Sequence, residues 1–265
     1  MDCARLKARK YLHDFGTVKQ FSEHQYKVTV MRIYRNKGVE DDEERKFTAK
    51  GEAGNTEKLD CSLSRSRSAV FELAYCNPWE YFVTLTLDKR KYNRYDLAKF
   101  IKDLSQFIRD YRKKYHVSVR YLLIPERHQD GAWHMHGFFE GLPEDHLHIF
   151  TLREQLPTKI RQRLMQGKAV FTWPPYASKF GFADIEKVEN NEAASKYITK
   201  YITEDMRRSV TEMNAHLYYA SKGLQRAEVI YSGYQTHELD DPDFRNDYVQ
   251  VKTVKTEKEA LAYFL

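Results

Sequence analysis

The chain has 265 residues, a formal net charge of +6 and an aromatic content of 14% that includes 19 tyrosines. A chain of this length can bury a substantial core in one large domain or in a domain with appendages. Its three cysteines, Cys3, Cys61 and Cys76, are too few and too widely spaced for a disulfide framework or a zinc ribbon, which indicates a reducing compartment. The sequence shows no signal-peptide pattern and no long apolar segment, so we expect a soluble protein of the cytoplasm without a membrane partner.

Basic and aromatic residues occur together along the chain. Lysine and arginine neutralise phosphates, and aromatic rings stack on unpaired bases, so the combination favours single-stranded nucleic acid as the partner. A solvated cationic surface would give the same charge balance, and composition alone does not separate the two interpretations.

The first 60 residues are predicted to hold little regular structure. Residues 1–24 are basic and irregular and suggest at most a short helix, whereas residues 26–34 (YKVTVMRIY) alternate as a strand does. Residues 36–60 are polar, with an acidic run at 40–44, and are interpreted as a loop.

Three stronger elements follow. Residues 62–75 have helical character, residues 81–87 (YFVTLTL) predict a strand, and residues 95–115 predict a long amphipathic helix. The apolar stripe of the long helix consists of Leu97, Phe100, Ile101, Leu104, Phe107 and Ile108.

The stretch from Glu126 to His136 (ERHQDGAWHMH) lies between two apolar, β-branched segments and contains Asp130-Gly131, which predicts a β-hairpin. A turn centred near Asp130 places Glu126 opposite His134, with Cβ atoms about 5 Å apart, and His136 diagonally beside them. Because side chains alternate along a strand, all three project from one face.

Two imidazoles and one carboxylate form a mixed nitrogen and oxygen ligand set. Such a set suits Mn²⁺, Zn²⁺ or Co²⁺, tolerates Mg²⁺ and leaves coordination positions open for substrate oxygens, as catalysis at a metal requires. A His-x-His pair by itself is more often an ordinary polar pair on a strand. The carboxylate across the turn is what favours a metal site.

Beyond the hairpin the predicted elements are shorter. They are a helix at 152–165 and strands at 171–173, 181–188, 227–231 and 248–254. We divide the chain into a basic N-terminal segment at 1–60, a central domain at 61–235 and a C-terminal tail at 236–265.

Residues 190–205 carry the second informative pattern, because an initial Asn, an early Glu and an apolar stripe predict a helix. Tyr197 and Tyr201 share one face of it, and Lys200 lies beside both, where its ammonium could reach a phosphate held near either hydroxyl. A phenol with a pKa around 10 is a weak nucleophile at neutral pH, so attack on a phosphate requires a metal or help in losing the proton. Tyrosines at this spacing are ordinarily packing residues, but their coexistence with the histidine hairpin favours chemistry.

Three motifs in this order resemble those of the HUH endonucleases, specifically the rolling-circle replication initiators (Rep proteins) of phages, plasmids and small DNA viruses. The likeness spans residues 81–203. The motifs are the strand Phe82-Val-Thr-Leu-Thr86, the metal site of Glu126 with His134-Met-His136, and Lys196-Tyr197-Ile-Thr-Lys200-Tyr201, which is similar to the two-tyrosine branch.

The two tyrosines differ in one respect. Tyr197 is followed three positions later by Lys200, as the nucleophile commonly is in that family, whereas Tyr201 is followed there by Glu204. We therefore expect Tyr197 to be the principal nucleophile and Tyr201 to be a second nucleophile or an auxiliary.

The resemblance implies an α+β fold with a central antiparallel sheet and flanking helices, in the ferredoxin-like or RRM-like arrangement. It also implies that Glu126, His134 and His136 hold Mn²⁺ or Mg²⁺ at the scissile phosphate. Tyr197 would then form a 5′-phosphotyrosyl link to single-stranded origin DNA and leave a free 3′-hydroxyl, with Lys200 orienting the phosphate or lowering the phenol's proton affinity.

The same resemblance implies contacts and partners. Thr84, Thr86 and Lys196 would contact the DNA. No GxxxxGK[ST] phosphate loop occurs in the sequence, so a separate helicase is expected to unwind the duplex and a polymerase to extend the 3′-hydroxyl, in the cytoplasm of a bacterial host cell.

Other functions are compatible with parts of the pattern. His134, His136 and Glu140 also satisfy the His-x-His-x-x-x-Glu pattern of a cupin-type metalloenzyme, although a cupin would be nearly all strand. A noncatalytic nucleic-acid-binding module would use the histidines and tyrosines to stack on bases. A relaxase or transposase of the HUH group is a further alternative, but relaxases usually place the histidine cluster after the tyrosine.

Overall fold

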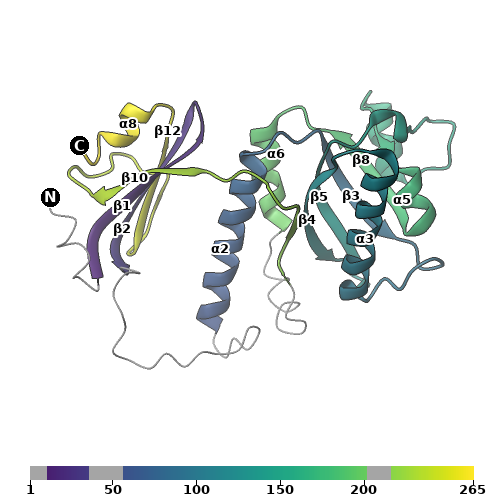
Figure 1. Cartoon of the computed structure of the whole chain (residues 1–265), viewed down its shortest axis with the longest axis horizontal. Coiled ribbons are helices and arrows are strands. Elements are labelled where there is room, and N and C mark those ends of the chain that lie inside the picture. The colour runs from purple at the N-terminus through teal and green to yellow at the C-terminus, as the bar shows by residue number, and fades with distance from the viewer. Residues whose placement is uncertain (1–10, 36–55, 202–215) are drawn as a thin grey trace. The chain divides into compact units, whose positions relative to one another are not determined.

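The computed structural model describes residues 11–35, 56–201 and 216–265. The chain forms two compact units, one made of Met1–Phe47 with Gln225–Leu265 and the other of Thr48–Leu224. Each unit is built on its own antiparallel sheet, and the architecture is α+β, as predicted (Figure 1). None of the helices in the described ranges is long and apolar enough to cross a bilayer.

Seven antiparallel strands form the sheet of the larger unit. In spatial order they are β6 (His148–Ile149), β7 (Phe171–Thr172), β8 (Gly181–Lys187), β3 (Tyr81–Leu87), β5 (Trp133–Glu140), β4 (Arg120–Arg127) and β9 (Tyr219–Ala220). β3 is the middle strand and pairs with β5 on one side and β8 on the other. The predicted hairpin is the pair β4 and β5, directly beside the middle strand.

Helices connect and cover these strands. They are α2 (Thr56–Tyr75), α3 (Leu97–Tyr115), α4 (Thr158–Met165), α5 (Pro174–Lys179) and α6 (Asn191–Ile198), with single 3₁₀ turns η1 (Glu144–His146) and η2 (Thr199–Tyr201).

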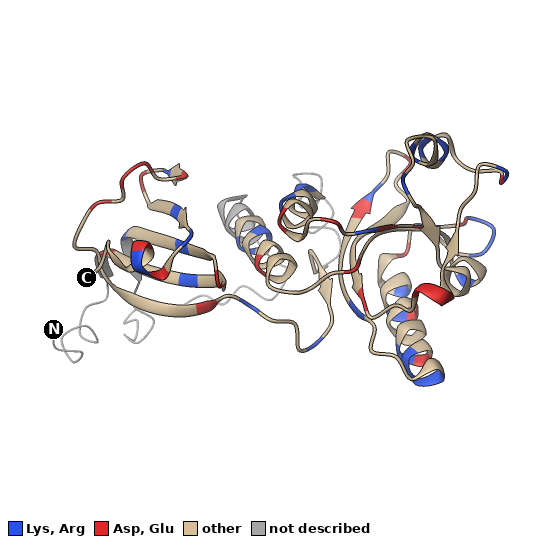
Figure 2. Ribbon diagram, turned by 90° about the horizontal axis from the view of Figure 1, so that it is seen from above, with Lys and Arg blue, Asp and Glu red and all other residues tan. Residues whose placement is uncertain are grey.

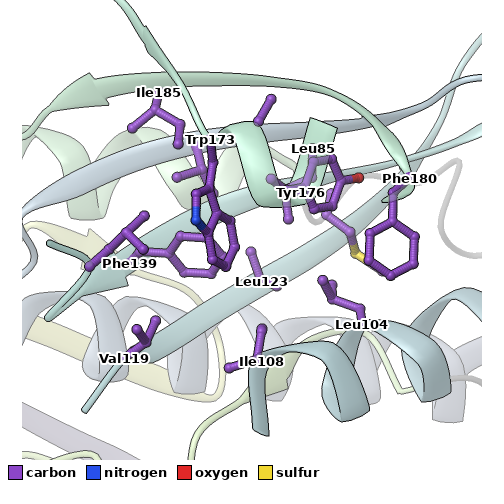
Figure 3. Packing of buried hydrophobic residues seen from close by; sticks show 14 of the residues in the cluster. Leu85, Leu104, Ile108, Val119, Leu123, Phe139, Trp173, Tyr176, Phe180 and Ile185 are labelled. Carbon is purple, nitrogen blue, oxygen red and sulfur yellow. The ribbon is translucent and has the colours of Figure 1, made fainter. Parts of the chain in front are cut away.

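One face of the sheet packs on α3 and α5 and forms the main apolar core (Figure 3). Along α3 the buried positions follow the spacing of one helical face, at Leu97, Phe100, Leu104, Ile108 and Tyr111. They meet every second residue of the strands, such as Val83 and Leu85 of β3 and Met135 of β5. The amphipathic pattern of the sequence therefore predicted both the helix and its buried face.

Local interactions fix where α3 begins and ends. The Asp96 side chain accepts a hydrogen bond from the Lys99 backbone N–H at 2.9 Å, which caps the first turn. The last turn carries Arg112, Lys113 and Lys114, whose charges favour the C-terminal end of the helix dipole (Figure 2).

The opposite face of the same sheet packs on α2 and α6. Its smaller cluster joins Val70 and Leu73 of α2, Ile124 of β4, Phe138 of β5 and Ile198 of α6, all of which are buried. These side chains alternate with those that contact α3, so both faces of the central strands are covered. The strands consequently contain few exposed apolar positions.

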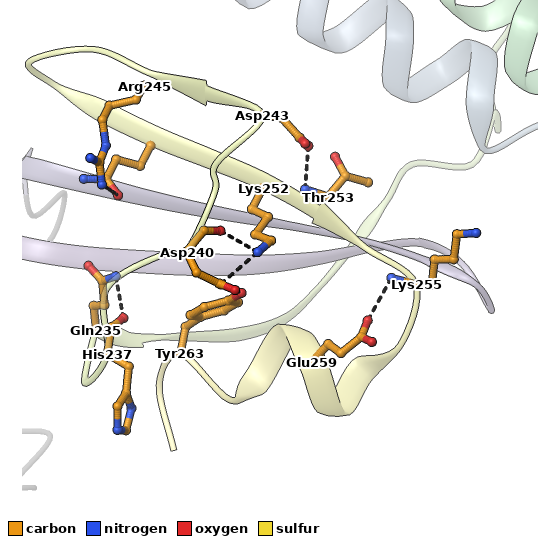
Figure 4. Close-up of polar contacts among 11 residues, drawn as sticks. Gln235, His237, Asp240, Asp243, Arg245, Lys252, Thr253, Lys255, Glu259 and Tyr263 are labelled. Carbon is orange, nitrogen blue, oxygen red and sulfur yellow. Dashed lines mark hydrogen bonds and ion pairs between the residues drawn. The ribbon is translucent and has the colours of Figure 1, made fainter.

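The smaller unit holds a five-stranded antiparallel sheet and one helix. In spatial order its strands are β10 (Glu228–Tyr234), β1 (Tyr11–Ser22), β2 (Gln25–Arg35), β12 (Val249–Val254) and β11 (Phe244–Arg245), and the helix is α8 (Glu257–Leu261). Val18, Val28 and Phe264 belong to its core. At its surface Asp240 accepts hydrogen bonds from Lys252, at 2.8 Å, and from the Tyr263 hydroxyl (Figure 4).

Several predicted boundaries differ from the observed ones. Residues 11–22 form strand β1 instead of irregular chain or a short helix, because β1 gains its order by pairing with β2 and with the distant β10. The helix predicted at 152–165 begins only at Thr158, after Pro157, which lacks the N–H that an interior helical position needs. The acidic run at 40–44 and residues 202–215 lie outside the described residues.

The division into units also differs from the predicted boundaries at 60/61 and 235/236. The N-terminal strands pair with β10 and β12, so the first and last parts of the chain share one sheet. Long-range strand pairing of this kind leaves no mark in local sequence composition.

Candidate active site

The β4–β5 hairpin forms as the sequence predicts. Glu126 pairs in register with His134, and His136 follows two residues later on the same strand face. At the turn Gly131 has φ +80°, a conformation that favours glycine, and the Asp130 carboxylate accepts a hydrogen bond from the Ala132 N–H at 3.0 Å. These contacts fix the register that brings the three groups together.

Gly137 lies where the backbones of β4 and β5 approach closely. A Cβ atom at this position would lie 1.9 Å from the Leu122 carbonyl oxygen of β4, so any side chain would force the two strands apart. Glycine is therefore required beside the histidines by the close backbone approach.

Both histidines are held from behind by threonines of β3. Thr86 lies opposite His134 and Thr84 opposite His136 in the β3–β5 register. In each pair the threonine Oγ1 is 3.1 Å from the histidine Nδ1. The Nε2 edge of each ring is thus the one left for the cavity.

The charges at the hairpin are set by these neighbours. Glu126 Oε2 lies 2.8 Å from His136 Nε2, and this hydrogen bond lowers the pKa of Glu126 against the opposing effect of burial. Burial lowers the pKa of His134 to about 4, with a further contribution from the nearby His128 and His136. His134 is therefore neutral at physiological pH, the state in which imidazole binds a metal.

The tyrosine helix α6 is fixed to the sheet by two asparagines. Asn190 caps it, accepting a hydrogen bond from the Ala193 N–H at 2.9 Å, as the sequence predicts. The Asn191 side-chain amide donates to the carbonyls of Tyr75 and Asn77 at 3.1 and 3.2 Å, just after α2. Ile198 is fully buried beneath the helix.

Tyr197 and Tyr201 lie on the same side of the sheet as the histidines. The Tyr201 ring stacks on His136 with centroids 4.1 Å apart, and both tyrosines contact Phe82 of β3. The Tyr201 hydroxyl donates to the Tyr197 hydroxyl at 3.0 Å. Lys200 Nζ lies 3.3 Å from the centroid of the Tyr197 ring.

The two phenols are electrostatically unequal. Burial raises the pKa of Tyr197, but hydrogen bonds with Lys200 and Tyr201 and the charge of Lys200 outweigh it, so its pKa lies below the ordinary value. Burial and the hydrogen bond to Tyr197 hold the pKa of Tyr201 far above that value. Tyr197 is also the more accessible, with 46% of its surface exposed.

A cavity of about 600 Å³ joins the two sets of residues. Its lining includes Glu126, His134, His136, Tyr197, Tyr201, Thr84 and Thr86. Lys196 instead pairs with Glu192 at 2.7 Å on the exposed side of α6 and is absent from the lining. Glu140, the alternative third ligand, forms an ion pair with Arg120 and does not line the cavity either.

Helix α4 and strand β8 supply lining residues that the sequence did not reveal. Lys159, Gln162, Arg163 and Gln166 share one face of α4 at the cavity, and Asp184 and Glu186 project from β8. Arg163 bridges the two carboxylates. His128, in the hairpin turn, stacks on His134 at 4.6 Å.

These residues were missed because their positions carry no local signal. A helix of eight residues after a proline and a strand of seven look ordinary in sequence. The spacing at 159, 162, 163 and 166 is that of one helical face, which could have suggested a shared polar surface but not what it faces.

The residue types present fit a divalent ion, since a carboxylate and neutral imidazoles with tethered Nδ1 atoms are typical ligands. As the side chains stand, no group of three or more His, Cys, Asp or Glu in the described part of the chain is arranged to hold a metal. Glu126 is instead paired with His136. Metal binding would therefore replace an existing ion pair.

Comparison with known families bears on the region that forms this cavity. Residues 80–206 match the model of a family of replication-associated proteins, the one described by the ORF2 protein. The match covers slightly less than half of the chain and contains all the residues that line the cavity. Comparisons with curated proteins and with solved structures gave no match. The family match supports a replication initiator of the Rep type.

Proposed function

We propose that this protein initiates rolling-circle DNA replication as an HUH endonuclease of the two-tyrosine branch. It nicks single-stranded DNA at an origin and later rejoins it. The observation that carries the proposal is that one cavity collects Glu126, His134 and His136 with Tyr197 and Tyr201, although the two sets lie on separate elements.

Tyr197 is the nucleophile of the first step. Its lowered pKa favours the phenolate, and its exposure leaves room for a DNA phosphate. The phenolic oxygen forms a bond to phosphorus as the bond from phosphorus to the 3′-oxygen breaks, giving a 5′-phosphotyrosyl link. The departing oxygen takes up a proton and becomes a free 3′-hydroxyl, which a separate polymerase extends.

Tyr201 supports that step with its proton in place. Its raised pKa keeps the hydroxyl protonated, and the hydrogen bond that it donates stabilises negative charge on the Tyr197 oxygen. After one round of synthesis, attack by Tyr201 or by a 3′-hydroxyl on the phosphotyrosine would rejoin the strand without an external energy source.

Glu126, His134 and His136 are the residues that would hold Mn²⁺ or Mg²⁺. A divalent ion bound there supplies charge stabilisation for a nonbridging phosphate oxygen. Lys200, beside Tyr197, adds a positive charge that favours the phenolate.

The surface of α4 at the cavity is suited to the DNA strand. The side chains of Lys159, Gln162 and Gln166 are exposed and carry no hydrogen bond or ion pair to another described residue. An ammonium group can contact a phosphate, and glutamine amides can bond to base edges. We assign this helix face to the strand that enters the cavity.

The test is covalent capture. The protein is incubated with Mn²⁺ and a library of single-stranded oligonucleotides, denatured and separated from free DNA, and the trapped ends are sequenced. Wild-type protein is expected to form an adduct that carries a 5′-phosphate on Tyr197, located by mass spectrometry. Tyr197→Phe should form none, whereas Tyr95→Phe, a change of an exposed tyrosine outside the cavity, should react normally.

Three outcomes would contradict the proposal. An adduct that forms at the wild-type rate in Tyr197→Phe would reject the nucleophile. An adduct indifferent to chelators would reject the metal. DNA binding without any covalent product would favour the noncatalytic binding module.

A further inference from the structure

The pairing of β3 with β5 repeats one contact twice. Thr86 and Thr84 project from the cavity face of β3, and each meets the histidine directly opposite through Oγ1 and Nδ1 at 3.1 Å. Two threonines two residues apart thus match two histidines two residues apart. A contact repeated in register along both strands points to a shared purpose.

The chemistry of imidazole makes this contact consequential. A neutral ring has one N–H and one lone pair, and which nitrogen keeps the proton depends on the bond that each makes. A ring whose Nδ1–H donates to an oxygen presents the Nε2 lone pair on its other side. Metal-binding histidines ordinarily have such an outer partner.

We propose that Thr86 and Thr84 are positioning residues that accept the Nδ1–H of His134 and His136 and so hold both Nε2 lone pairs toward the cavity. The inference rests on the proposed function, because it concerns the same ligand set. It gives the β3 threonines a role other than DNA contact, since their hydroxyls are already engaged by the rings.

Threonine suits this role for steric reasons. Its branched Cβ restricts rotation about χ1 on a strand, so the hydroxyl stays aimed at the neighbouring ring. Valine has the same shape without the hydroxyl, which makes Thr→Val a substitution that removes the hydrogen bond and little else.

His134 is the better reporter of the two rings. Its Nε2 makes no hydrogen bond to another described residue, whereas His136 Nε2 faces the Glu126 carboxylate at 2.8 Å. The tautomer of His134 therefore depends chiefly on Thr86.

The first measurement is the His134 tautomer in metal-free protein, read from ring ¹⁵N shifts and long-range ¹H–¹⁵N couplings at neutral pH. Wild type is expected to show the Nδ1–H form. Thr86→Val should increase the Nε2–H form, and Thr86→Ser, which restores a hydroxyl, should return the spectrum toward wild type. Finding mainly Nε2–H in the wild type would overturn the inference without any variant.

The second measurement is Mn²⁺ affinity by calorimetry. Loss of an outer-shell partner should weaken binding by about 10–100-fold in Thr86→Val, with Thr86→Ser close to wild type. Thr172→Val is the matched control, because Thr172 lies in the same sheet, on β7, with a buried hydroxyl that has no hydrogen-bond partner among the described residues. It should leave both the tautomer and the affinity unchanged.

His134→Ala separates the two levels of the argument. If His134→Ala abolishes Mn²⁺ binding but Thr86→Val binds as wild type does, the positioning role is wrong and the metal site stands. If His134→Ala binds Mn²⁺ with wild-type affinity, the metal site of the proposed function is wrong as well.

Discussion

The two faces of the seven-stranded sheet use the same strands for different purposes. On β3, Val83 and Leu85 are fully buried against α3, whereas Thr84 and Thr86 between them contact histidine rings at the cavity. One face is apolar and closed, and the other combines a small apolar cluster with titratable groups around a cavity. Alternation along a strand thus lets one backbone support both stability and chemistry.

The comparison indicates how the site keeps its geometry. Its side chains stand on strands whose opposite faces are locked into the main core, so the backbone beneath them has little freedom. The tyrosines, in contrast, stand on a helix of eight residues held by asparagine contacts and one buried isoleucine. Changes on each face should therefore affect different measurable quantities.

The largest effect is expected from His134→Ala on the cavity face. Nicking should fall by at least about 10³-fold, equivalent to roughly 4 kcal/mol of transition-state stabilisation, because the ligand set loses an imidazole. Unfolding midpoints in urea should stay close to wild type. A variant that nicks normally would show that the histidine hairpin has no part in the reaction.

Leu104→Ala tests the opposite face. Leu104 is 2% exposed beneath α3, and its truncation should lower the free energy of unfolding by about 3 kcal/mol, measured by urea denaturation. The nicking rate per folded molecule should be unchanged. A large loss of rate in fully folded protein would contradict the separation of the two faces.

Asn191→Ala tests the attachment of the tyrosine helix. Removing the amide that bonds to the Tyr75 and Asn77 carbonyls should cost about 1–2 kcal/mol and loosen α6. The nicking rate should fall while Mn²⁺ affinity, measured by calorimetry, stays constant. Glu192→Ala, which removes only an exposed ion pair on the same helix, is the control and should change neither quantity.

Lys159→Ala should have the smallest effect. Losing one phosphate contact should weaken binding of single-stranded DNA a few-fold and reduce the slope of log affinity against log salt by about 0.7. Lys168→Ala removes the same charge from a residue outside the cavity and should leave the slope unchanged. Equal effects of the two variants in a fluorescence titration would remove α4 from the DNA path.

The sequence by itself determined the local elements on which the site stands. Strong alternation fixed β3 at 81–87, the Asp130-Gly131 turn fixed the pairing of Glu126 with His134, and the Asn cap fixed the start of α6. These features depend on contacts between residues close in the chain, so a pattern of a few residues specifies them.

Only the tertiary structure decided how distant segments meet. The stacking of Tyr201 on His136, the threonines behind the histidines, and the α4 face at the cavity all join residues at least ten positions apart. The pairing of β1 with β10, which unites the two ends of the chain, is of the same kind. Such contacts arise from packing and strand order across the whole fold, and because no local pattern encodes them, composition and periodicity could not reveal them.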